Sequence, residues 1–207
     1  MIEQNKIYCA DSTKLITEID SNSVDLIFID SIRILPNSDM PHMIDCHRIL
    51  KDGGTFCLFC QAQSEDTLSV KVDTLSRIGF GFSYTVKIYD QTPTGYDEIM
   101  VCYKGDKQYR SKDYIEHKII TDQRPNIGKY DTTESLMFSI TAMERSVELY
   151  KKLISNFTEE GMLVIDLYAN SFVAIEAAIV LNRRYIGCDD SFDKYEIATK
   201  RLKGLEK

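Results

Sequence analysis

Short apolar runs alternate with amphipathic stretches along most of the chain. The runs at 24–30 and 162–166 are continuous and bounded by polar residues, which is typical of buried parallel strands. Between such runs, apolar residues recur every three or four positions and predict helices at 39–51, 65–78, 143–157, 172–181 and 192–202. This alternation predicts an α/β fold with a mainly parallel, seven-stranded sheet and helices on both faces.

Three segments need a more specific prediction. Lys51-Asp52-Gly53-Gly54 is expected to end the helix at 39–51, before a strand at 55–60. The strands expected at 82–90 and 96–104 flank the turn-rich sequence QTPTG, which predicts a terminal antiparallel hairpin. Residues 105–135 are polar and weakly periodic, so we expect a loop or small insertion there. At 207 residues, the chain 1–207 is expected to form a single domain.

The charge balance argues against strong DNA binding by the chain alone. The sequence holds 25 Lys and Arg against 32 Asp and Glu, and affinity for nucleic acid rests largely on basic side chains that neutralise phosphates. No apolar run approaches the length of a membrane span, and the polar opening MIEQNKIY lacks the features of a secretory signal. We therefore expect a cytoplasmic protein that makes no membrane contact.

The six cysteines are scattered through apolar segments, which is typical of small core residues in a reducing compartment. No disulfides are expected. Cys57 and Cys60 form a CxxC sequence, but they lie within a predicted strand, where positions three apart face opposite sides of the sheet. The spacing therefore argues against a metal site, and no metal is expected.

In open parallel sheets, ligands bind at the carboxyl ends of the strands, so the residues that follow each predicted strand matter most. Six pieces of the sequence, in this order and spacing, resemble the permuted (beta) class of DNA adenine-N6 and cytosine-N4 methyltransferases. They are NKIYCAD at 5–11, NSVDLIFID at 22–30, CHRILKDGG at 46–54, ERSVELYKKLI at 144–154, EEGMLVIDLYANS at 159–171 and RRYIGCDDSFDKYEIATKRL at 183–202. The resemblance implies a Rossmann-like, S-adenosylmethionine-dependent methyltransferase fold.

The catalytic loop departs from that family. Its members end the catalytic strand with a DPPY-type motif, in which the Asp holds the target amino group and the aromatic ring stacks on a flipped base. Here the four residues are Asp30, Ser31, Ile32 and Arg33. Asp30 persists, but the prolines that preorganise the loop and the stacking ring are absent. The resemblance therefore implies a vestigial catalytic site.

The cofactor loop departs as well. The family sequence Asp-Pro-Phe-x-Gly-x-Gly-Thr brings the backbone close to S-adenosylmethionine, whereas this chain has Asp166-Leu167-Tyr168-Ala169-Asn170-Ser171-Phe172-Val173. Asn170 stands at the first glycine position and tolerates the left-handed conformation. Phe172 stands at the second, where we expect its ring to block the place of the cofactor.

Other residues keep positions that the family uses for the cofactor. Asp189 follows the strand RRYIGC, where the resemblance implies an acid for the ribose hydroxyls, and Asp11 follows the opening strand on the adenine side. Glu144 and the basic residue Arg145 persist at the start of the helix at 143–157, where the resemblance implies a lead-in that contributes to the cofactor pocket, although both prolines and the histidine of that lead-in are lost. Together with Asp166 and Tyr168 these three acids form the vestigial cofactor set. Asp11 and Asp189 could equally cap helices, and Glu144 could complement a helix dipole.

Three hypotheses of function follow. The first is a catalytically inactive methyltransferase-like protein that binds no cofactor and acts as a partner or regulatory subunit in DNA modification or defence. Such a chain would form homo- or hetero-oligomers, an active methyltransferase being one candidate partner, and would reach DNA weakly or through that partner. The second is an active site-specific DNA amino-methyltransferase that uses S-adenosylmethionine in an atypical pocket. The third is an acidic protein that contacts the DNA-binding surface of another protein.

Overall fold

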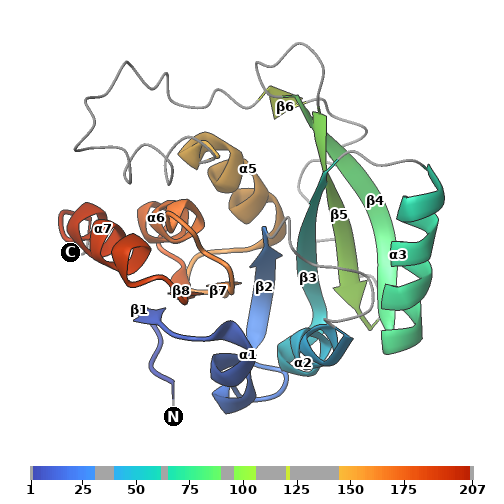
Figure 1. Ribbon diagram of the computed structural model, residues 1–207, viewed down its shortest axis with the longest axis horizontal. Coiled ribbons are helices and arrows are strands. Elements are labelled where there is room, and N and C mark those ends of the chain that lie inside the picture. Colours follow the sequence, from blue (N-terminus) through green and yellow to red (C-terminus); the bar gives the residue numbers. More distant parts are fainter. Residues whose placement is uncertain are drawn as a thin grey trace.

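The strands of the described residues form one mixed sheet in the order β1-β8-β7-β2-β3-β5-β4-β6 (Figure 1). The computed structural model describes residues 2–30, 40–61, 65–89, 96–105, 120–121 and 145–205. The strands are β1 (Lys6–Cys9), β2 (Val24–Ile29), β3 (Leu50–Gln61), β4 (Phe80–Tyr89), β5 (Tyr96–Lys104), β6 (Ile120–Thr121), β7 (Leu163–Asp166) and β8 (Arg184–Asp189). The helices are α1 (Ser12–Leu15), η1 (Ile16–Glu18), α2 (Met40–Ile49), α3 (Glu65–Ile78), α5 (Val147–Phe157), α6 (Val173–Val180) and α7 (Phe192–Leu202).

In the parallel part of the sheet the strands end at one edge, so the residues that follow them lie at that edge. Strands β1, β8, β7, β2 and β3 pair in parallel, as the alternation of strands and helices predicts. The antiparallel hairpin is confirmed by the pairing of β4 with β5, and β5 pairs with β3. The two-residue strand β6 extends the sheet beyond the seven predicted strands and lies within the predicted insertion, most of which falls outside the described residues.

One predicted boundary is wrong. The helix is not ended by Lys51 to Gly54, because α2 already ends at Ile49 and β3 begins directly at Leu50. Leu50 pairs with Val24, but the next pair joins Leu26 to Thr55, so these residues bulge out of the strand. Gly53 has a φ of 78°, and a Cβ on Gly54 would lie 2.9 Å from the Leu50 side chain. The two glycines therefore serve the bulge.

Each face of the sheet has its own hydrophobic core. One core includes Leu153 of α5, Ile175 of α6 and Leu202 of α7, and the other includes Leu15 of α1, Met43 of α2 and Leu75 of α3. Figure 1 shows α5, α6 and α7 grouped together, away from α1 and α2. Cys57 lies in the first core and Cys60 in the second, which confirms that the two CxxC thiols face opposite sides. All six cysteines are free.

Side-chain caps set the helix starts that border the site. Asp11 caps α1 by accepting a hydrogen bond from the Thr13 N–H, and Ser191 caps α7. The Ser146 hydroxyl accepts from the Leu149 N–H, so α5 begins at Val147 and Arg145 lies outside the helix. Among the helices that the structure describes, none combines the length and the apolar character needed to traverse a bilayer.

Candidate functional site

Three acidic residues meet where neighbouring parallel strands end. Asp30 directly follows β2, Asp166 is the last residue of β7, and Asp189 is the last residue of β8. Phe28 is level with Asp166, and Asp166 is level with Gly187. The sequence predicts this grouping, because parallel strands end on one edge of a sheet. The structure brings the predicted acids together as an acidic cluster.

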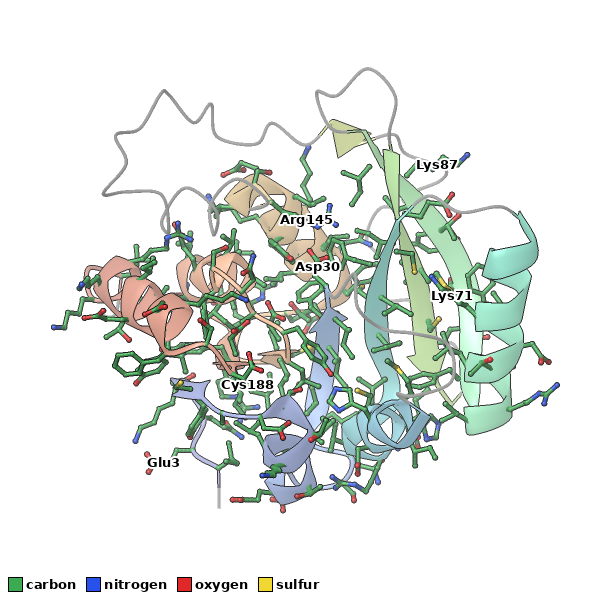
Figure 2. The ribbon with its side chains drawn as sticks, viewed as in Figure 1. Glu3, Asp30, Lys71, Lys87, Arg145 and Cys188 are labelled. Atoms are coloured by element: carbon green, nitrogen blue, oxygen red, sulfur yellow. The ribbon has the colours of Figure 1, made fainter. Side chains whose placement is uncertain are left out.

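The carboxylate of Asp30 is held by an arginine. Arg145 Nε donates to Oδ2 at 2.5 Å and Arg145 Nη2 lies 3.3 Å from Oδ1, in the forked geometry that suits a guanidinium and a carboxylate. Figure 2 shows the two labelled side chains next to each other at the end of β2. The arginine side chain is only 8% exposed and that of Asp30 only 22%, so water screens the pair weakly.

Aromatic side chains surround this ion pair. The Arg145 guanidinium carbon lies 4.6 Å from the centre of the Phe59 ring, a cation–π geometry. The Tyr150 hydroxyl donates to Asp30 Oδ2 over 3.3 Å, and the Tyr150 ring packs edge-on against Phe28. Burial, followed by the charge of Asp30, raises the pKa of Tyr150 well above its ordinary value, which keeps the phenol neutral and able to donate.

Asp166 is the most deeply buried acid of the cluster, with 2% of its surface exposed. Burial raises the pKa of Asp166 well above its ordinary value, and the charges of Asp30 and Asp189 raise it further. The Tyr168 N–H donates to Asp166 Oδ1 at 3.3 Å and favours the charged form. Because burial is the largest cause, Asp166 favours its protonated form far more than an exposed aspartate does.

Asp189 fixes the loop that follows β7. Its Oδ2 accepts hydrogen bonds from the Asn170 N–H at 3.0 Å and from Lys194 Nζ at 3.3 Å, while Oδ1 accepts from the Ser191 N–H at 3.0 Å. Asn170 has a φ of 47°, the left-handed conformation that the sequence suggests for this position. Both carboxylate oxygens of Asp189 therefore have partners within the chain.

The ring of Phe172 packs inside the core between α6 and β8. Phe172 is fully buried and adopts a left-handed φ of 59°. A Cβ on Gly187 would lie 3.0 Å from Phe172 Cδ1 and 2.6 Å from Ile175 Cγ1, so the missing side chain of Gly187 provides the room for both. The ring thus belongs to the core, and its exclusion of a cofactor stays a prediction.

The remaining predicted residues lie at the margins of the cluster. Asp11 is exposed and accepts hydrogen bonds from both the N–H and the hydroxyl of Thr13, so it serves as a helix cap. Tyr168 is half-buried, and its ring packs edge-on against His42 of α2 at 5.4 Å between centres. Ser31, Ile32, Arg33 and Glu144 fall outside the described residues.

The sequence singles out Arg145 only as a basic residue that persists beside Glu144, and it indicates no role for Tyr150 or Phe59. Arg145 and Tyr150 hold Asp30, and Phe59 packs against the Arg145 guanidinium. The signal available in the sequence was a basic residue directly after Glu144 in the segment that leads into α5. In the described ranges, no group of three or more His, Cys, Asp or Glu side chains could hold a metal ion.

The sheet order, with acids at the ends of β2, β7 and β8, is that of Rossmann-like methyltransferases. The family is identified by a match in sequence. A family model described as DNA methylase, of the N6 and N4 methyltransferases, matches residues 40–200. This match spans more than half of the chain, so the chain belongs to that family. A search of curated proteins finds no match to the chain.

Solved structures show the same fold. The structure of the M1.HpyAVI–SAM complex matches with a TM-score of 0.72 and 18% identity over 96% of this chain and 98% of that chain. TTHA0409 from Thermus thermophilus, complexed with S-adenosyl-L-methionine, matches with a TM-score of 0.67 and 13% identity over 97% of this chain and 94% of its own. The cytosine-N4-specific PvuII DNA methyltransferase matches with a TM-score of 0.69 and 12% identity over 98% and 87% of the two chains. The predicted S-adenosylmethionine-dependent methyltransferase fold is confirmed.

A double-mutant cycle tests the ion pair of Arg145 and Asp30. Arg145→Met and Asp30→Asn each remove one partner, and we expect a coupling energy of about 1–3 kcal/mol in urea unfolding because the pair is weakly screened. The pair of Lys151 and Glu148 on α5, with side chains 30% and 71% exposed, is the better-solvated control and should give less than about 0.5 kcal/mol. Equal coupling in the two cycles would contradict the described geometry.

Replacing Asp166 tests its buried environment. The pKa of Asp166 is raised in the folded chain, so the folded state holds a proton that the unfolded state releases, and the contribution of this carboxyl to wild-type stability falls as pH rises above about 4. Asp166→Asn cannot ionise. Its free energy of unfolding relative to wild type should therefore increase with pH, by up to about 1.4 kcal/mol per pH unit within the affected range.

Urea unfolding between about pH 4 and pH 8 measures this difference. The exposed carboxyl of Asp20 provides the control, and the difference between Asp20→Asn and wild type should stay nearly constant over the same range. A pH-independent difference for Asp166→Asn would show that the Asp166 carboxyl is not perturbed.

Proposed function

We propose that this DNA methylase family member is catalytically inactive and acts by binding, as a partner or regulatory subunit of DNA modification or defence. The single observation that carries the proposal is the capture of Asp30 by Arg145. In methyl transfer to an amino group, positive charge develops on the attacking nitrogen, and a nearby carboxylate stabilises it. A fixed guanidinium cancels that stabilisation and also repels a sulfonium methyl donor.

The cofactor side supports the same proposal. An acid that binds both ribose hydroxyls needs two acceptor positions, but Asn170, Ser191 and Lys194 already take up three of the roughly four that the Asp189 carboxylate offers. Phe172 stands at a glycine position of the family loop, and its ring fills core space beside Gly187. These residues fit S-adenosylmethionine poorly, and we propose that the chain uses no cofactor.

Calorimetry with S-adenosylmethionine tests the proposal. The wild-type chain should show no binding tighter than about 1 mM, whereas the M1.HpyAVI protein, solved as a SAM complex, provides the positive control. Phe172→Ala and Lys194→Ala separate the two obstacles, because a gain of binding in one variant assigns the block to that ring or to that lysine. A wild-type dissociation constant near 1 μM would favour the active enzyme with an atypical pocket.

The binding role requires a partner. The fold of the family persists, while the three residues after Asp30 depart from the family motif. A binding surface can be kept when a catalytic site is lost, because the two are separable parts of a fold. With a net charge of −7, the chain is a weak candidate for binding DNA unaided. We propose a second methyltransferase-like chain, identical or different, as the partner.

Affinity purification of the tagged chain from its native cell, with sedimentation of the purified chain, tests this. We expect either a self-associated species or a co-purifying methyltransferase. A monomer that captures no methyltransferase would contradict the partner proposal and leave the calorimetric result unaffected.

A further inference from the structure

The groups around the Arg145 guanidinium have the composition of a recognition site for planar cations. Asp30 supplies a carboxylate for forked hydrogen bonds, Phe59 supplies an aromatic face, and the neutral Tyr150 hydroxyl holds Asp30 Oδ2 in place. The three groups come from different elements: Asp30 follows β2, Phe59 lies on β3 and Tyr150 on α5. Their arrangement therefore depends on the packing of β2, β3 and α5 together and not on the Arg145 side chain alone.

We propose that Asp30, Tyr150 and Phe59 form a binding site for a guanidinium group, and that Arg145 of the same chain is its resident ligand. This proposal rests on the proposed function in one respect: it takes the end of β2 to be the former site of the methyl acceptor. The ligand class is planar cations with in-plane N–H donors, that is, alkylguanidinium and amidinium ions. Ammonium ions carry the same charge but lack the flat fork.

The site should keep its shape when Arg145 is removed. Phe28, Phe59 and Tyr150 are all at least 96% buried and belong to the core shared with α5 and α6. Their rings contact one another, with centres 5.2 Å apart for Phe28 and Tyr150 and 5.7 Å apart for Phe59 and Tyr150. Arg145, by contrast, lies outside α5 and before its cap Ser146. A side chain from outside the helix thus occupies a site whose walls are part of the core.

Occupation by Arg145 differs physically from a simple loss of function. A tethered ligand has a high effective concentration, so a free molecule reaches the site only by displacing Arg145. The acceptor end of the sheet is then closed by an intramolecular competitor, and removal of that competitor should open it. This predicts a ligand-binding activity in a variant that the wild-type chain lacks.

Thermal unfolding of Arg145→Ala with ethylguanidinium chloride, at matched ionic strength, tests the proposal. The melting temperature should rise with ligand concentration and level off in the millimolar range. Ethylammonium should bind at least about tenfold more weakly than ethylguanidinium. Wild type should show no saturable rise, because Arg145 fills the site. Arg77→Ala removes an exposed arginine that pairs with Asp73 and should show none either.

The double variant Arg145→Ala/Asp30→Asn identifies the carboxylate as the receptor. It leaves no unpaired charge at the site, so it should fold, and its affinity for ethylguanidinium should fall about tenfold or more. Equal responses of the single and double variants would overturn the proposal. If Arg145→Ala folds only with the ligand present, the proposal is supported. If it stays unfolded at every ligand concentration while the double variant folds, the proposal is wrong.

Failure of this inference and failure of the proposed function give different results. Absence of ethylguanidinium binding would contradict the proposed guanidinium site and would leave the calorimetric result with S-adenosylmethionine unaffected. Micromolar binding of S-adenosylmethionine by wild type would contradict the inactive-enzyme proposal, and the response of Arg145→Ala to ethylguanidinium would remain valid evidence for the guanidinium site.

Discussion

The ion pair of Asp30 and Arg145 is the contact on which the account of this site depends. A carboxylate at the end of a central strand, with a second buried acid on the adjacent strand, needs compensation by an opposite charge or a proton. Arg145 provides that charge for Asp30, and Tyr150 adds a hydrogen bond from α5. The ion pair that compensates the charge of Asp30 therefore occupies the carboxylate oxygens that amino-methyl transfer would use.

The neighbouring acids follow the same logic with other partners. Asp189 is satisfied by two backbone N–H groups and Lys194, and in return it holds Asn170 in its left-handed conformation. Asp166 has no cation among its described hydrogen-bond partners, and burial raises its pKa instead. Each acid at the edge of the sheet is thus neutralised in its own way. The family fold is retained, and the polar groups at its ligand-binding edge are directed toward one another.

The sequence predicts the fold and the position of the acids well, because both depend on local periodicity and on the rule that parallel strands end on one edge. The opposite facing of Cys57 and Cys60 follows from the same two-residue period. The bulge at Lys51–Gly54 was not predicted, since consecutive glycines more often mark the end of a helix. The role of Arg145 was not predicted either. It meets Asp30 across 115 residues, and no local pattern reports such a contact.

We propose that Asp30, paired with Arg145, supports no methyl transfer. Incubation of the purified wild-type chain with DNA and S-adenosylmethionine carrying a labelled methyl group tests it most directly, with the PvuII DNA methyltransferase as a positive control. We expect label in DNA at the level of a protein-free blank. Repeated turnover by the chain alone would contradict the account.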